Sequence, residues 1–520
     1  MSMTFSPEEA AAHGMALAAI SALYPERLAI AAPAGDRTFA ALNARANQLA
    51  RALRARGLEP GDGVALVCSN RPEFAEVVYA VLRSGLRLTP INWNLTANEM
   101  ALIVADCEAR AIVADARFAD AAARAAREAP RARVRLGLAG GIPGFESYDD
   151  ALEAESDVDL VDPCLGGEML YTSGTTGRPR GVCRPPGTLE REPGLAAIPR
   201  QLSYRPGEDL HLCTGPLYHA APLAFSLTIP LNQGCGVVMM ESWSAERCLE
   251  LIEGYRITHA HMVPLMFRRL LALEVEERRL RDLSSLRMIV HGAAPCPREL
   301  KQSMIDWLGP VLYEYYAATE GWGCLVSPEE WLERPGTVGR PEAGQVEIRN
   351  EQNTLQPAGE PGLVYLRSPP GGRFAYFKDA AKTSSVYLGD HFTLGDVGYL
   401  DGDGYLFLCD RSADVINRGG VDVYPAEVDA VLLGYALVRD AATVGVPHPE
   451  WGEEVLSVVE LQDGVLGSPE LAERLAAHCR EHLARYKCPR RIEFSEALPR
   501  YETGKVYRRL LRDEYRKGRH

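Results

Sequence analysis

Long apolar runs are missing from this sequence. A helix that spans a membrane needs about 18 or more consecutive apolar residues, and no run in the 520 residues approaches that length. The first twelve residues also lack the basic and then apolar order of a secretory signal peptide. These absences predict a cytoplasmic protein without transmembrane segments.

Closely spaced cysteines are absent as well. Twelve cysteines are scattered along the chain, and none forms a C-x-x-C pair. Structural zinc sites and disulfide frameworks use such spacings, whereas an isolated cysteine packs as a small apolar side chain. The sequence therefore favours buried free thiols.

An excess of basic residues is lacking too. The formal net charge is −14, which argues against binding to the phosphate backbone of nucleic acids. Only the segment 485–520 is basic, with twelve Lys and Arg against five Asp and Glu. We predict small-molecule partners and no nucleic-acid partner, and leave a homodimer open.

Helices and strands alternate in the first part of the chain. At 520 residues the chain is too long for one hydrophobic core. Amphipathic helices such as 39–56 and apolar helices such as 72–83 alternate with short apolar strands such as 64–68. This alternation is typical of a doubly wound parallel sheet. A second set of the same kind is predicted between 180 and 325.

The texture changes after residue 336. Short alternating segments are separated there by Gly, Pro and Asp turns, which predicts a small β-barrel or sandwich. After Asp410 a mixed unit follows, with a helix at 425–433 and a strand at 441–446. We therefore predict an α/β protein. A large N-terminal domain, 1–410, contains two doubly wound α/β subdomains and a small β-barrel, and a small α+β domain, 411–520, follows it.

One stretch, 169–182, is unusually rich in groups that bind anions. It reads M-L-Y-T-S-G-T-T-G-R-P-R-G-V, which is neither a Walker A loop nor a G-x-G-x-x-G turn. Glycines allow successive backbone N–H groups to point inward, and hydroxyl and guanidinium groups add donors. The predicted phosphate-binding residues are Thr172, Ser173, Gly174, Thr175, Thr176, Gly177 and Arg180. A polar surface turn is the alternative interpretation.

This order of hydroxyls and glycines resembles the phosphate loop of the AMP-forming acyl-CoA synthetases. That superfamily also contains firefly luciferase and the adenylation domains of peptide synthetases. Its loops usually carry Lys where this chain has Arg180, which keeps the positive charge. Further segments resemble family motifs in the same order, between about 165 and 510: H-G-A-A-P at 291–295, Y-A-A-T-E at 316–320, F-T-L-G-D at 392–396, D-R-S-A-D at 410–414 and L-P-R-Y-E-T-G-K at 498–505.

The resemblance implies a site for ATP and Mg²⁺. In the family the Tyr of the second motif lies against adenine and its Glu binds Mg²⁺, which assigns these roles to Tyr316 and Glu320. A purine suits an aromatic face and a hard cation suits a carboxylate. Asp396 accepts hydrogen bonds from the ribose hydroxyls, with Arg411 nearby. The other residues implied for the nucleotide are Gly292, Ala293, Ala294, Tyr315, Ala317 and Thr319, and Thr172 joins Glu320 at the metal.

The resemblance also assigns roles to the C-terminal domain, which is mobile in the family. Lys505 in the terminal motif would contact the α-phosphate and the attacking carboxylate. Gly419, Gly420 and Val421 would line the tunnel for the pantetheine arm of coenzyme A, because glycine lets an extended chain pass close to the backbone. The usual charge at the hinge is replaced here by Ala413.

The acyl pocket is predicted to be mainly apolar. His219 aligns with a His that lines the carboxylate or acyl pocket in relatives and is a catalytic candidate, although a satisfied core histidine is the alternative. The pocket candidates are His219, Pro222, Phe225, Ser226 and Trp322. Their character favours a medium-chain fatty acid or an aromatic acid.

The resemblance thus implies an ATP-dependent carboxylic acid:CoA ligase that works through an acyl-adenylate. Three alternatives stay open. The acyl-AMP could pass to a carrier protein or another acceptor instead of CoA, or react with oxygen as in luciferase. A nucleotide-binding protein without catalysis is the third, but such a protein is expected to have lost residues like Glu320, Asp396 and Lys505, which are present.

Overall fold

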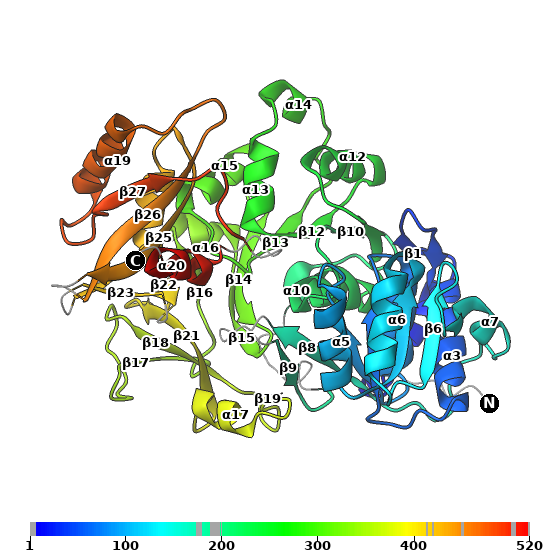
Figure 1. Ribbon diagram of the computed structural model, residues 1–520. Helices are drawn as coiled ribbons and strands as arrows, with labels where there is room; N and C mark the ends of the chain where they lie inside the picture. The colour runs from blue at the N-terminus through cyan, green and yellow to red at the C-terminus, as the bar shows by residue number, and fades with distance from the viewer. Residues whose placement is uncertain are drawn as a thin grey trace.

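The computed structural model describes residues 7–172, 179–187, 198, 200–411, 414–418, 421–448, 452–500 and 506–517. Figure 1 shows two α/β units on one side, an antiparallel sheet beside them, and the C-terminal domain with its own sheet and helices. In the described part of the chain, no helix combines the length and the apolar character that crossing a membrane requires. All twelve cysteines are free thiols and most are buried, as predicted.

The first eight-stranded sheet has the order β19-β9-β8-β4-β3-β5-β6-β7. Its strands are β3 (Gly63–Val67), β4 (Arg87–Pro90), β5 (Ala109–Asp115), β6 (Val134–Leu138), β7 (Glu146–Ser147), β8 (Gly167–Thr172), β9 (Arg180–Cys183) and β19 (Ala375–Tyr376). The neighbouring helices are α1 (Pro7–Ala12), α2 (Ala16–Leu23), α3 (Phe39–Ala55), α4 (Pro72–Leu82), α5 (Ala97–Asp106), α6 (Ala119–Glu128) and α7 (Tyr148–Glu153). Strands β3 to β7 run parallel, as the alternation predicts.

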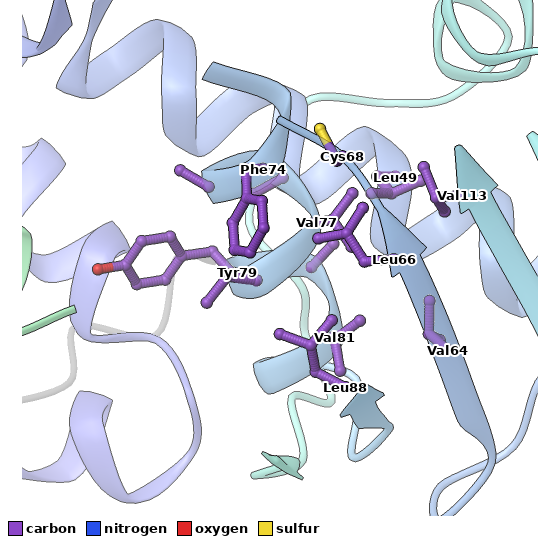
Figure 2. Close-up of a cluster of buried hydrophobic side chains, with 14 of the residues drawn as sticks. Leu49, Val64, Leu66, Cys68, Phe74, Val77, Tyr79, Val81, Leu88 and Val113 are labelled. Carbon is purple, nitrogen blue, oxygen red and sulfur yellow. The ribbon is translucent and has the colours of Figure 1, made fainter. Parts of the chain in front are cut away.

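Burial on both faces explains why β3 is a continuous apolar run. Every residue of β3 is buried, which is usual for a parallel strand covered by helices on both sides. In Figure 2, Phe74 and Val77 of α4 and Leu49 of α3 gather around Leu66 of this strand. The hydroxyl of Thr38 accepts a hydrogen bond from the backbone N–H of Ala41 and so caps α3 at its start.

The second eight-stranded sheet has the order β15-β14-β13-β12-β10-β11-β1-β2. Its strands are β1 (Leu28–Ala31), β2 (Arg37–Thr38), β10 (Leu210–Cys213), β11 (Gly236–Met239), β12 (His259–Met262), β13 (Met288–His291), β14 (Leu312–Ala318) and β15 (Gly321–Val326). Its helical segments are α10 (Ala220–Leu223), the π-helical turn η2 (Ala224–Thr228), α11 (Ile229–Asn232), α12 (Ala245–Tyr255), α13 (Pro264–Leu271), α14 (Val275–Arg279), α15 (Arg298–Leu308) and α16 (Pro328–Glu333).

The predicted limits of this second unit were incomplete. The sequence assigned it to 180–325, but β1 near the N-terminus pairs in parallel with β11, with Ile30 opposite Val237. Conversely, β9 pairs with β8 and belongs to the first sheet. Each sheet therefore contains a strand that the sequence placed in the other unit.

Six antiparallel strands occupy the region predicted as a small β-barrel. They are β16 (Thr337–Gly339), β17 (Val346–Arg349), β18 (Gly362–Arg367), β20 (Tyr387–Leu388), β21 (His391–Leu400) and β22 (Leu406–Arg411), and α17 (Ala380–Val386) accompanies them. β22 continues to Arg411, the first residue that the sequence assigned to the C-terminal domain.

The described residues of the C-terminal domain form a five-stranded sheet and three helices. Its strands are β23 (Ile416–Arg418), β24 (Val421–Val423), β25 (Val438–His448), β26 (Gly452–Leu461) and β27 (Arg491–Phe494). Its helices are α18 (Pro425–Leu433), α19 (Pro469–His482) and α20 (Arg508–Lys517). The Arg268 guanidinium of α13 lies 3.1 Å from the Asp440 carboxylate of β25, which joins this domain to the second α/β unit.

Candidate active site

A cavity of about 2780 Å³ lies beyond the carboxyl ends of the parallel strands in the second sheet. Thr214 after β10, Val263 after β12 and Ala293 after β13 line it. Open α/β sheets bind ligands at this edge because the loops there leave crevices between successive strands. The C-terminal domain contributes Arg500 and Val506 to the lining. The cavity is therefore built from both domains.

The predicted phosphate loop connects two strands that pair with each other. β8 and β9 pair in antiparallel register, with Thr172 opposite Arg180, and both residues line the cavity. The Arg180 Nε lies 3.5 Å from an Asp379 carboxylate oxygen. The loop residues themselves lie outside the described residues: Ser173, Gly174, Thr175, Thr176 and Gly177. The hairpin thus places both ends of the loop at the cavity.

Tight packing and an unusual backbone shape the loop after β13. A Cβ atom on Gly292 would lie 2.7 Å from the backbone oxygen of Tyr315, so only glycine fits there without displacement. Ala293 has a φ of 64°, a left-handed conformation that costs free energy for a residue with a side chain. Ala293 and Ala294 line the cavity. Their small side chains fit the role predicted for an adenine wall.

Tyr316 and Asp396 meet in the cavity although eighty residues separate them. The Tyr316 hydroxyl donates to Asp396 Oδ2 over 2.7 Å, and both residues line the cavity. In the β21–β22 ladder, Asp396 is directly opposite Arg411. The Arg411 side chain lies outside the described part of the structure. The residues predicted to bind adenine and ribose therefore lie next to each other in the cavity.

Glu320 accepts a hydrogen bond from a tyrosine that the sequence did not single out. The Tyr376 hydroxyl donates to Glu320 Oε1 over 2.9 Å. Burial, and then the negative charge of Glu320, raise the pKa of Tyr376, so the phenol remains a donor at neutral pH. Glu320 Oε2 has no hydrogen-bond partner among the described residues, and Glu320 lines the cavity. The hydrogen bond to Oε1 fixes the carboxylate, and Oε2 suits a hard divalent cation such as Mg²⁺.

The backbone before Glu320 is held by a second unpredicted residue. Arg184, just past β9, donates from Nη2 to the Thr319 carbonyl oxygen. Thr319, Arg184 and Ala317 all line the cavity. The contact ties the hairpin that carries the phosphate loop to the segment that carries Glu320. A single Arg after a strand gives no sequence signal for such a role.

Aromatic rings enclose the predicted acyl pocket. Phe225 stacks on His261 with centroids 5.6 Å apart, and Tyr315 stacks on Trp322 at 6.3 Å. The Tyr315 hydroxyl and His261 Nε2 are 3.1 Å apart. Burial lowers the pKa of His261 to about 4, so this imidazole is neutral at physiological pH. The residues that line the cavity here include His219, Pro222, Phe225, His261, Tyr315 and Trp322.

Ser226 does not share this position. Its side chain is fully buried, and its hydroxyl lies 3.1 Å from His211 Nε2. It belongs to the π-helical turn η2, which has more residues per turn than an α-helix. Ser226 therefore faces the interior behind the cavity wall, instead of the acyl pocket for which it was predicted.

Most of the site residues predicted in the C-terminal domain lie outside the described residues. Lys505, Gly419 and Gly420 lie outside the described residues, and for Val421 only the backbone, in β24, is described. Arg500 and Val506, which flank the segment of Lys505, form an antiparallel bridge and line the cavity. The roles of Lys505 and of the tunnel residues stay predictions.

Comparisons with known proteins agree with this geometry. The model of the AMP-binding enzyme family matches residues 17–373, and that of the AMP-binding enzyme C-terminal domain matches 427–505. A feruloyl-CoA synthase from Amycolatopsis sp is 32% identical over 482 residues, 92% of this chain and 94% of that protein.

Solved structures of adenylate-forming enzymes also resemble this chain along most of its length. The anthranilate CoA ligase AuaEII, determined with anthranoyl-AMP, has a TM-score of 0.85 at 25% identity and covers 96% of this chain and 97% of its own. The amide bond synthetase McbA from Marinactinospora thermotolerans has a TM-score of 0.83 at 28% identity, over 96% of this chain and 99% of its own.

Proposed function

This chain belongs to the AMP-binding enzyme family, and from that premise we propose that it is an ATP-dependent carboxylic acid:CoA ligase. One observation carries the proposal: a single cavity joins the Tyr316–Asp396 pair, Glu320 and an aromatic acyl pocket. A nucleotide and an acid bound there would lie side by side. Relatives across most of the chain are named as a CoA synthase or as CoA ligases.

The reaction has two steps. A carboxylate oxygen of the acid attacks the α-phosphorus of ATP, and the bond from that phosphorus to the bridging oxygen breaks, which gives acyl-AMP and pyrophosphate. The thiol of CoA then loses its proton and its sulfur attacks the acyl carbon, which releases AMP. The carboxylate alone is a poor acylating agent because oxide would have to leave. The protein contributes positioning and neutralisation of charge, as in phosphoryl transfer in general.

We assign roles to the residues on this basis. Thr172 and Glu320 would hold Mg²⁺, which neutralises phosphate charge when bound. Tyr316 would lie against adenine, while Asp396 and Arg411 would bind ribose. Lys505 would stabilise charge at the α-phosphate, and Gly419 and Gly420 would admit the pantetheine arm.

The walls of the acyl pocket favour an aromatic acid within the predicted range. Phe225, Tyr315 and Trp322 present flat faces, and aromatic rings gain from offset or edge contacts with one another. The neutral His261 adds a polar group beside them without a charge to repel or attract the carboxylate. Relatives named for feruloyl-CoA and anthranilate agree with this choice.

A panel of acids tests the proposal directly. AMP release is measured with benzoate, hydroxycinnamates and fatty acids of increasing length, each with and without CoA. We expect acid-dependent release that requires CoA and is fastest with an aromatic acid. Acid-dependent ATP–pyrophosphate exchange without AMP release when CoA is added would support the second candidate, transfer to an amine or carrier acceptor, which the similarity to an amide bond synthetase favours. The absence of both acid-dependent exchange and AMP release would refute both.

Trp322→Ala is expected to shift the preference toward longer or bulkier acids. The indole lines the cavity and stacks on Tyr315, so its removal deepens the pocket. Each additional buried CH₂ contributes roughly 0.8 kcal/mol, or about fourfold in kcat/KM. Trp307→Ala, at a half-buried Trp on α15, is the control and should leave the profile unchanged. An unchanged profile in Trp322→Ala would return Trp322 to a purely structural role.

A cytoplasmic location and a homodimer remain predictions. The need for ATP and CoA is compatible with the cytoplasm, where fractionation should find the protein. Light scattering after size exclusion should separate a monomer of 56.9 kDa from a dimer of twice that mass.

A further inference from the structure

Three side chains that commonly bind metals lie together at the end of α19. His478, Glu481 and His482 each offer a ligand atom, and these atoms lie within 4.8 Å of one another. Glu481 and His482 follow His478 by three and four residues, so each is a neighbour of His478 on the helix surface. None of them belongs to the nucleotide, acyl or tunnel residues above. In Figure 1, α19 lies at the margin of the C-terminal domain, and His478 and His482 also line the cavity described above.

Both imidazoles are already oriented as metal ligands usually are. His478 Nε2 lies 3.2 Å from the Val431 carbonyl oxygen of α18, and His482 Nδ1 lies 2.9 Å from the His478 carbonyl oxygen. A carbonyl only accepts, so these two nitrogens carry the protons, and His478 Nδ1 and His482 Nε2 are the basic nitrogens of the neutral rings. Metal-binding histidines characteristically donate their other N–H to a backbone carbonyl or a carboxylate, which fixes the tautomer and the ring.

The electrostatics of the helix end also suit a cation. Glu481 and His482 lie in the last turn of α19, and His478 lies one turn before His482. The partial negative charge of the unpaired carbonyls at this helix end favours positive charge. Two nearby cations are paired with carboxylates. Arg480 lies 2.5 Å from Glu473, and Lys487 lies 2.7 Å from Glu427.

We propose that His478, Glu481 and His482 form a binding site for a late first-row divalent cation, with Zn²⁺ as the best match. Two imidazole nitrogens and one carboxylate oxygen are a usual zinc donor set, and they leave a further coordination position for water or a small ligand. Mg²⁺ and Ca²⁺ prefer oxygen ligands throughout. This site is therefore chemically distinct from the Mg²⁺ position at Glu320.

Metal binding would couple two helices of the C-terminal domain. The His478 ring bonds to α18 through Val431 and packs edge-on against Tyr435 at 5.2 Å. Val431, His478 and His482 line the cavity shared with the large domain. A cation that fixes both rings therefore stabilises the α18–α19 contact, and a ligand that binds only the folded state raises the melting temperature.

Calorimetric titration of the full-length protein with ZnCl₂, without ATP or Mg²⁺, tests the site. Wild type is expected to show one site that His482→Ala and Glu481→Ala lose or weaken by at least about 10-fold. Both residues are exposed, so these variants should fold normally. His448→Ala, at another histidine of the same domain, is the matched control and should keep the site.

Co²⁺ separates this site from the free thiols. Bound Co²⁺ should show d–d bands without a thiolate charge-transfer band, and His482→Ala should lose these bands. Zn²⁺ should raise the melting temperature of wild type and of His448→Ala, but not of His482→Ala. Equal stoichiometry in wild type and His482→Ala, or a thiolate band that persists in that variant as the sole signal, would overturn the proposal.

Discussion

Glu320→Ala is expected to lower the rate of acyl-adenylate formation by ~10²-fold or more, the usual loss for one well-placed group that stabilises charge. The carboxylate lines the cavity, and Tyr376 holds one of its oxygens. If Glu320 holds Mg²⁺ as proposed, the variant lacks one ligand for the cation and neutralises the developing pyrophosphate charge less well. ATP–pyrophosphate exchange at saturating acid measures this step alone, because CoA takes no part in it.

Two further variants make the result specific. Glu320→Gln keeps the shape and loses the charge, so it should be nearly as slow as Glu320→Ala if binding of the cation is the role. Tyr376→Phe removes only the hydrogen bond to Oε1 and should lose about 10-fold or less. Equal melting temperatures would exclude a folding defect. Near-normal exchange in Glu320→Ala would remove Glu320 from the site.

Local structure followed closely from local pattern. The helix predicted at 425–433 is α18, and the buried strand predicted at 64–68 is β3, shifted by one residue. Alternation cannot say which sheet a strand joins, because the same apolar run fits either. That is why β1 was not assigned to the second sheet, where long-range pairing with β11 places it.

Site residues were predictable from the sequence where each belongs to a recognisable motif. Tyr316 and Asp396 are examples: each lies in its own motif, and the fold brings the two within hydrogen-bond distance. Tyr376, Arg184 and His261 act singly, so no spacing identifies them. Ser226 was wrongly placed in the acyl pocket: it lies in the π-helical turn η2 and is fully buried against His211, which composition does not reveal.

The Lys505 segment and the glycine loop are expected to serve different half-reactions. In this structure Arg500 and Val506, on either side of the Lys505 segment, line the cavity. Arg268 of the large domain contacts Asp440 and the Arg439 carbonyl oxygen, and Arg500 pairs with the same Asp440. If Lys505 acts in adenylation as proposed, these contacts hold the domain in the pose for that step. Entry of the pantetheine arm would require the domain to rotate and present Gly419 and Gly420 instead.

Lys505→Ala should therefore reduce ATP–pyrophosphate exchange by ~10²-fold or more, yet leave CoA able to consume acyl-AMP that is supplied. Gly420→Leu should do the reverse, because a branched side chain would fill the proposed pantetheine tunnel and leave the nucleotide site untouched. Lys517→Ala, at another lysine of the terminal segment, is the control and should spare both steps. Ala413 lacks the hinge charge usual in the family, so the two poses can differ in population. Such a difference would change the rate of each half-reaction by the same factor in wild type and in both variants. The opposite pattern of the two variants survives such scaling. Equal loss of both half-reactions in each variant would show that one fixed pose serves the whole reaction and that the domain does not alternate.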